Sequence, residues 1–218
     1  MELYFLRHGR SVSRSDWTEN DSERPLTEEG KVAMVHEAAT LVRLGVRPDL
    51  VISSPLTRAL QTAEIAAIGI EAADHLTTDE RLGEGFGLKP LRKLLREHEG
   101  AECVLLVGHE PDLSQVVGEL TGGRVMISKG GLVRVDVDEV KAGDGKLVWL
   151  LQADELIGGA LGTQADATIG DTRPDRSESD EPPYQTTTAP TGEEVPLLDD
   201  AAPDRDVSAD KHESEQAA

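Results

Sequence analysis

Three short runs of almost wholly apolar residues punctuate the first half of the chain, at residues 3–6, 49–53 and 102–107. The first run, Leu3-Tyr4-Phe5-Leu6, contains no polar residue. Such a run is typical of a strand that is buried on both faces, whereas a half-exposed strand alternates apolar with polar residues. Each run is followed in turn by a segment with helical features. Strands of this kind that alternate with helices predict a largely parallel sheet covered on both faces.

The segment before the second run has the features of a helix. Thr27 suits the N-cap position, and the acidic residues Glu28 and Glu29 suit the positive end of the helix dipole. Gly45 favours termination of the helix. Between these signals, apolar residues recur roughly at helical spacing: Val32, Val35, Ala39, Leu41, Val42 and Leu44.

Three further helices and three further strands complete the predicted secondary structure. Helices are expected from Ser54-Pro55 onward, over 90–99, and from Pro111 to Gly122-Gly123. A short strand is expected near 75–77, and two alternating runs at 132–137 and 147–151 flank a Gly-rich turn, which predicts a hairpin. The expected fold is therefore α/β: a three-layer α/β/α sandwich whose mostly parallel central sheet ends in an antiparallel edge hairpin.

Charge divides the chain at about residue 157. The formal net charge is −20, and residues 158–218 alone carry 15 acidic and 4 basic residues. This tail has low hydrophobicity and almost no apolar run, so it is not expected to bury enough surface to offset the entropy of ordering. We therefore predict one domain at 1–157 and a disordered acidic tail at 158–218.

Composition also restricts the class of protein. An acidic surface argues against non-specific binding of nucleic acid, and no apolar stretch approaches the length of a membrane span. No signal peptide is evident, so a soluble cytoplasmic protein is expected. The lone cysteine, Cys103, lies in an apolar run and is expected to be a small buried hydrophobic residue. The sequence carries no signal for a particular oligomeric state.

Cationic or titratable residues follow all three apolar strands. Arg7-His8-Gly9 follows the first, Ser54-Pro55 with Arg58 the second, and Gly108-His109 the third. Because the carboxyl ends of parallel strands lie at one edge of the sheet, two arginines and two histidines are expected to converge there if the strands are adjacent.

This set of side chains suits a phosphoryl group. Two guanidinium groups match the oxygens of a tetrahedral phosphate, and one histidine is able to attack phosphorus while the other donates to a phosphoryl oxygen. A metal site is the competing interpretation for the two histidines, but no carboxylates accompany them in the pattern, which favours an anion. We therefore expect no metal and no cofactor.

In the order and spacing of its motifs, the chain resembles the histidine phosphatase (phosphoglycerate mutase-like) superfamily, and specifically SixA-like phosphohistidine phosphatases. The matching motifs are Arg7-His8-Gly9, Arg-Pro-Leu-Thr at 24–27, the segment 53–63 that contains Arg58, and Gly108-His109. The resemblance covers residues 1 to about 153. It implies that His8 is the nucleophile that becomes phosphorylated, that Arg7, Arg58 and His109 hold the phosphoryl oxygens, and that no metal is needed. Gly9 is expected to line the substrate site and to leave His8 exposed for attack.

The general acid is the part of the resemblance that matches least well. Arg14 stands where mutase-like members usually have Asn, and Glu84 matches the mutase-type acid only loosely. Asp21, just before the Arg-Pro-Leu-Thr segment, matches the acid of SixA-like proteins better. Asp21 and Glu84 are both candidates, and so is a site without a general acid.

These observations predict that the protein is a phosphatase that hydrolyses protein phosphohistidine through a phospho-His8 intermediate. The expected partner is a phosphohistidine-bearing carrier or phosphotransfer protein, because only 51 positions separate Arg58 from His109 and leave little chain for a lid. The alternatives are a phosphomonoesterase that acts on a small phosphoester and a non-catalytic phosphate-binding regulator. The regulator is disfavoured because the nucleophile and its cationic neighbours are all present.

Overall fold

The computed structural model describes residues 1–153, 155 and 156, so the tail at 158–218 lies outside the described residues. Six strands form one sheet in the order β3-β2-β4-β1-β5-β6. The strands are β1 (Glu2–Arg7), β2 (Leu50–Ser53), β3 (Leu76–Thr78), β4 (Cys103–Gly108), β5 (Leu132–Asp136) and β6 (Lys146–Leu151). The first four are mutually parallel, whereas β5 and β6 pair antiparallel. The predicted parallel sheet and edge hairpin are both confirmed.

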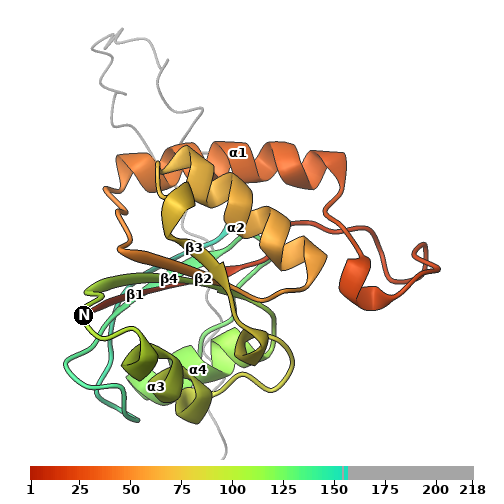
Figure 1. Ribbon diagram of the computed structural model, residues 1–218. Helices are drawn as coiled ribbons and strands as arrows, with labels where there is room; N and C mark the ends of the chain where they lie inside the picture. The colour runs from red at the N-terminus through yellow and green to blue at the C-terminus, as the bar shows by residue number, and fades with distance from the viewer. Residues whose placement is uncertain (154, 157–218) are drawn as a thin grey trace, which may run out of the picture. The chain divides into compact units, whose positions relative to one another are not determined.

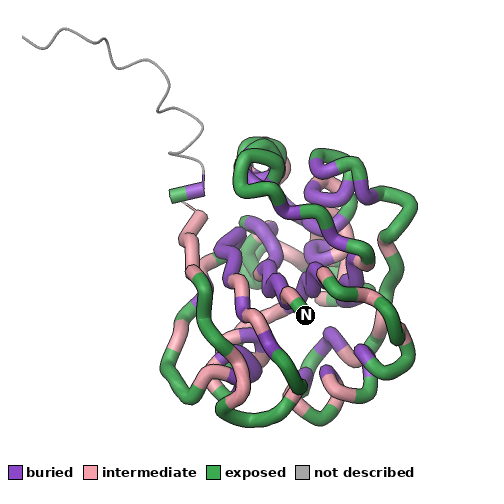
Figure 2. The backbone as a smooth tube through the Cα atoms, turned by 90° about the vertical axis from the view of Figure 1, so that its left-hand side faces the viewer, coloured by how far each residue is buried: buried purple, intermediate pink, exposed green. Residues whose placement is uncertain are grey.

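Helices cover both faces of this sheet, as the apolar strands predict (Figure 1). Helices α1 (Glu28–Arg43) and α2 (Thr57–Gly69) lie on one face, and α3 (Leu88–Glu97) and α4 (Asp112–Thr121) lie on the other. Each face has its own apolar core, in which residues that alternate along β1 and β4 point to opposite sides. The purple interior and green exterior of Figure 2 follow these layers. Each helix of the described part is too short or too polar to cross a bilayer.

The prediction for α1 is right about the helix and wrong about its inner face. Thr27 caps the helix and accepts a hydrogen bond from the Gly30 N–H. The buried side chains include Met34, Ala38 and Leu41, whereas the valines of the predicted apolar set face outward; Val32 and Val35 are 58% and 57% exposed. The buried face packs closely against α2, where a Cβ added to Gly69 would lie 2.5 Å from the Ala38 Cβ, so only small side chains fit at that contact.

Helix α2 begins two residues later than Ser54-Pro55 predicts. Leu56 keeps an extended backbone, and the first helical residue is Thr57. The Ser54 N–H still pairs with the Val107 carbonyl, as in the sheet. The strand direction therefore continues past β2 before the helix starts, and Arg58 lies in the first helical turn as expected.

One minor expectation is corrected. Cys103 is half-buried rather than buried in the core, because it is the first residue of β4.

Candidate functional site

The order of the central strands brings the predicted site residues together. Strand β4 lies between β1 and β2, and Arg7 at the end of β1 is level with Gly108 at the end of β4. The His8 N–H donates to the Gly108 carbonyl, which places His8 next to the start of the loop that carries His109. The His8 and His109 ring centroids are 5.2 Å apart. We call the group formed by Arg7, His8, Arg58 and His109 the phosphoryl site.

The ring of His8 is held in one tautomer. Its Nδ1 lies 2.8 Å from the Gly9 carbonyl oxygen. A carbonyl oxygen can only accept, so Nδ1 carries the proton and Nε2 keeps a free lone pair. Thr62 supports this turn, since its hydroxyl accepts from the Gly9 N–H and donates to the Arg58 carbonyl. Gly9 itself is packed against Met34, and a Cβ there would lie 2.9 Å from the Met34 Cγ.

Both histidines are neutral at physiological pH. His8 is buried, not exposed as expected from Gly9, and this burial is the main reason that its pKa is lowered to about 3. The neighbouring His109, Arg58 and Arg7 also lower the pKa, whereas the hydrogen bond to the Gly9 carbonyl raises it. Burial also lowers the pKa of His109 to about 4, and the charge of Arg58 adds to the effect. A neutral imidazole is the nucleophilic form, so His8 is ready for attack without a base to deprotonate it.

Several nitrogens of the phosphoryl site are buried without a hydrogen-bond partner among the described residues. They are Arg7 Nε, Arg58 Nε and His109 Nδ1. The other ring nitrogen of His109, Nε2, lies 2.8 Å from the Ser54 hydroxyl, which is able to donate to it and leave the proton on Nδ1. A buried donor without a partner costs about 1–3 kcal/mol. Unsatisfied donors on residues gathered around His8 suit the oxygens of an anion such as a phosphoryl group.

Asp21 joins the site from the short 3₁₀ helix η1 (Asp21–Glu23). Its carboxylate accepts from Arg24 Nε at 2.9 Å and lies 3.3 Å from Arg58 Nη1 and 3.4 Å from Arg14 Nε. The Arg24 hydrogen bond, supported by the charges of Arg58 and Arg14, holds the pKa of Asp21 below its usual value. Asp21 is therefore an ionised partner that orients Arg58, and a carboxylate held in this form is a poor proton donor.

Glu84, the other candidate acid, is exposed in the loop between the 3₁₀ helix η3 (Glu80–Leu82) and α3. The backbone of this loop is fixed by Asp112, whose Oδ2 accepts from the Gly85 and Phe86 N–H groups. Within the described residues, the Glu84 side chain forms no hydrogen bond or ion pair with the phosphoryl site.

Sequence reasoning gave no role to three residues beside the site. Ser54 bonds to His109, and Thr62 ties Gly9 to the Arg58 carbonyl. Glu110 accepts from the Ser114 hydroxyl at 2.8 Å, and its charge favours the charged form of Arg7. Ser54 and Thr62 lie within the matched motif at 53–63, which was the available signal, but hydroxyl hydrogen bonds depend on tertiary contacts that no spacing reveals.

A metal site does not emerge from the described residues. Among them, no three side chains of His, Cys, Asp or Glu lie together in a group suited to a metal ion. Metal independence remains a prediction, and it is tested below.

Comparisons with known proteins identify the family of this chain. A model of the histidine phosphatase superfamily (branch 1) matches residues 3–90. An uncharacterized protein of Picosynechococcus sp. is 36% identical over 139 residues, which cover 61% of this chain and 83% of that protein.

Solved structures extend the likeness to most of the described domain. The protein histidine phosphatase SixA, in complex with tungstate, superposes with a TM-score of 0.64 and 26% identity, over 72% of this chain and 99% of that one. The alpha-ribazole phosphatase of Shigella flexneri gives a TM-score of 0.55 at 18% identity, over 70% of this chain and 97% of that one, a likeness that shows the fold alone.

Proposed function

The chain belongs to branch 1 of the histidine phosphatase superfamily and is SixA-like, and from this premise we propose that it is a phosphatase that hydrolyses protein phosphohistidine through a phospho-His8 intermediate. Phosphatase activity follows from the family. Our proposal goes beyond the family in three respects: the choice of phosphohistidine as substrate, the absence of a metal, and the roles of individual residues.

The reaction has two steps. The free lone pair on His8 Nε2 attacks phosphorus, the new N–P bond forms, and the bond from phosphorus to the leaving imidazole breaks. Arg7, Arg58 and His109 hold the three phosphoryl oxygens during this transfer. Water then attacks the phosphorus of phospho-His8, the N–P bond breaks, and inorganic phosphate leaves while Nε2 regains its lone pair.

The choice of substrate rests on one observation: the nucleophile is already neutral, whereas both candidate general acids are poorly suited to donate a proton. An alkoxide leaving group needs a strong general acid, and Asp21 is held ionised while Glu84 is exposed. A phosphohistidine leaves as an imidazole, which solvent can protonate near neutral pH because its unperturbed pKa is about 6.5. A site whose general acid is poor should therefore cleave an N–P bond faster than an O–P bond.

The experiment compares turnover on two substrates with one preparation. The full chain is incubated with a phosphohistidine-bearing phosphotransfer protein and, separately, with sugar phosphates, and kcat/KM is measured for each. We expect phosphohistidine to be favoured by at least about a hundredfold, the scale of a missing acid catalyst. A comparable kcat/KM on the two substrates would instead indicate a phosphomonoesterase that acts on small phosphoesters.

Two controls belong to this experiment. Rapid quenching with radiolabelled substrate should trap label on His8, whereas a non-catalytic phosphate-binding regulator would bind substrate without labelling. EDTA should leave the rate unchanged. Activity that is lost with EDTA and returns with added metal would revive the metal interpretation.

A further inference from the structure

Ser54 lies between the end of β2 and the first turn of α2, and it is fully buried. Its backbone N–H donates to the carbonyl of Val107 in β4, the strand that leads into His109. The Ser54 hydroxyl lies 2.8 Å from Nε2 of His109. Because a hydrogen bond of the sheet joins the two segments, the backbone itself holds this hydroxyl beside this ring.

The hydrogen bonds around the Ser54 hydroxyl show where its proton points. The Leu56 N–H donates to Ser54 Oγ at 3.3 Å, and an N–H group can only donate. A hydroxyl group has a single proton, and within the described residues His109 Nε2 is the only acceptor that the Ser54 hydroxyl meets. Ser54 is therefore the donor in this contact, and Nε2 is the acceptor.

This assignment fixes the tautomer of His109. The ring is neutral at physiological pH because burial lowers its pKa to about 4, so it carries one ring proton. With Nε2 as an acceptor, the proton lies on Nδ1, which is buried and has no partner among the described residues. The reverse tautomer would bury two unsatisfied groups instead of one, namely the Ser54 hydroxyl proton and the Nδ1 lone pair.

The two rings of the phosphoryl site therefore present opposite chemistry. In each ring, one nitrogen is engaged by a neighbour and the other is free. The Gly9 carbonyl engages the Nδ1–H of His8, so the free group of His8 is a lone pair. The Ser54 hydroxyl engages the Nε2 lone pair of His109, so the free group of His109 is an N–H. A negatively charged phosphoryl oxygen is attracted by an N–H and repelled by a lone pair.

We propose that Ser54 is a positioning residue whose hydroxyl holds His109 in the tautomer that has a free Nδ1–H for a phosphoryl oxygen. Ser54 acts through the ring of His109. The proposal rests on the proposed function for the identity of the ligand, whereas the tautomer is a property of the chain without any ligand.

Nitrogen-15 NMR of the full-length chain at pH 7 measures the tautomer, because a protonated ring nitrogen and a nitrogen with a free lone pair resonate at different shifts. His109→Gln identifies the His109 signals among those of the six histidines. In the parent chain, Nδ1 of His109 should be protonated and Nε2 should not. Ser54→Ala should move both signals toward the reverse tautomer, since nothing then holds Nε2 as an acceptor.

Ser53→Ala is the matched control. Ser53 is also fully buried, and its hydroxyl donates to the Ser54 carbonyl rather than to a histidine. This variant loses one buried hydroxyl and should keep the His109 signals of the parent. A parent ring that is protonated on Nε2, or a tautomer that Ser54→Ala leaves unchanged, overturns the proposal. Ser54→Cys, whose thiol is a weak donor, supplies the same comparison if Ser54→Ala does not fold.

Calorimetry with inorganic phosphate tests the donor role of His109. Ser54→Ala should bind phosphate at least about tenfold more weakly, the scale of one hydrogen bond to a charged group, and Ser53→Ala should stay within about twofold of the parent. In a His109→Ala background, Ser54→Ala should cost less than about a further twofold, because its effect passes through the ring. An equal loss in both backgrounds would mean that Ser54 acts independently of His109, which overturns the proposal.

Failure of this proposal is distinguishable from failure of the proposed function. Turnover of a phosphohistidine-bearing protein by the parent chain tests the function, whereas the tautomer and the phosphate affinity test Ser54. If the substrate is not hydrolysed but Ser54→Ala changes both the tautomer and the phosphate affinity, the proposed function fails and the role of Ser54 stands. If the substrate is hydrolysed and the tautomer does not respond to Ser54→Ala, the reverse holds.

Discussion

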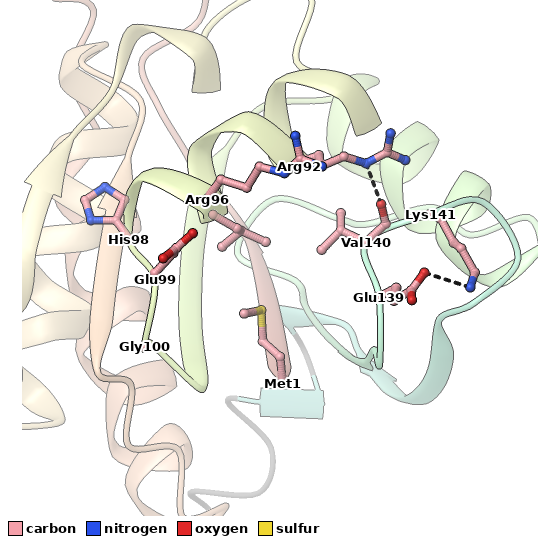
Figure 3. Close-up of a pocket in the computed structure, with 10 residues that line it drawn as sticks. Met1, Arg92, Arg96, His98, Glu99, Gly100, Glu139, Val140 and Lys141 are labelled. Carbon is pink, nitrogen blue, oxygen red and sulfur yellow. Dashed lines mark hydrogen bonds and ion pairs between the residues drawn. The ribbon is translucent and has the colours of Figure 1, made fainter.

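Both ends of the central strands carry clustered cations, but the two clusters differ in burial and in hydrogen bonding. At the amino edge, Arg92, Arg96 and Lys141 line an open hollow of about 640 Å³ together with Met1 (Figure 3). The six residues of β1 separate Met1 from the phosphoryl site, which corresponds to about 20 Å of strand. This group of cations is therefore remote from His8.

The difference lies in burial and in which donors have partners. Lys141 pairs with Glu139 at 2.9 Å, and Arg92 Nε donates to the Val140 carbonyl. At the carboxyl edge, Arg58 is 7% exposed and its Nε has no partner among the described residues. Exposed cations with solvent and counter-charges around them contribute little, whereas buried donors without partners bind an anion strongly. Positive charge alone therefore does not locate a phosphoryl site.

The largest expected effect comes from removing the nucleophile. His8→Ala should lower kcat by more than about a hundredfold, because loss of a nucleophile costs far more than loss of a supporting contact. The melting temperature should not fall sharply, since His8 lies past the end of β1 rather than within either core. Steady-state kinetics and thermal unfolding measure the two quantities. Residual activity above about one hundredth of the original would exclude His8 as the nucleophile.

Arg58→Lys should have the next largest effect. The lysine keeps the charge but lacks the planar fork that reaches both the phosphoryl oxygens and Asp21, so kcat/KM should fall on the order of a hundredfold. Asp21→Asn should cost about tenfold, because it loosens Arg58 without removing it. The comparison is made by kcat/KM on a phosphohistidine substrate. A greater loss in Asp21→Asn than in Arg58→Lys would restore Asp21 as the general acid.

The lowered pKa values predict a shallow pH dependence of activity. An unperturbed histidine nucleophile would lose about tenfold in kcat/KM between pH 7 and 5.5. With the pKa of His8 at about 3, the loss over this interval, corrected for ionisation of the substrate, should be less than about twofold. A tenfold loss would mean that His8 titrates as an ordinary surface histidine.

The same pKa values set the sign of a change in stability. The unfolded chain binds protons at His8 and His109 near pH 6.5, whereas the folded chain keeps both neutral down to about pH 3 to 4. Stability should therefore fall as the pH decreases from about 6.5 toward 4, by on the order of 1.4 kcal/mol per pH unit for each histidine. Burial raises the pKa of Glu37 to about 8, so this carboxyl group keeps a proton in the folded chain and offsets one of the two histidines between about pH 6.5 and 4.5. The net slope should therefore be on the order of 1.4 kcal/mol per pH unit, and His109→Gln should remove most of it. Denaturant unfolding at several pH values measures both slopes.

The smallest effect is expected at the amino edge. The double variant Arg96→Gln, Lys141→Gln removes two positive charges from the hollow in Figure 3 and should change kcat/KM by less than about twofold, since exposed charges about 20 Å away are screened at physiological salt. A loss comparable with that of Arg58→Lys would show that this edge takes part in binding the substrate.

Much of this protein was accessible from residue patterns. Uniform apolar runs located the central strands. The residues after these runs predicted which cationic and titratable side chains lie together, because the carboxyl ends of parallel strands share one edge. The inner face of α1 was not accessible in this way. Spacing places Val32, Val35 and Val42 on one side of the helix, but it does not say whether that side meets the sheet or the solvent.

Residue patterns alone predict the alternation of strands and helices, and they predict that Arg7, His8, Arg58 and His109 meet at the carboxyl ends of the strands. These depend on local periodicity and on the order of elements along the chain. The folded structure is needed to see that Asp21 pairs with three arginines and that both histidines are neutral. Charge states and ion pairs depend on burial and on distances between segments far apart in the chain, and residue spacing contains neither.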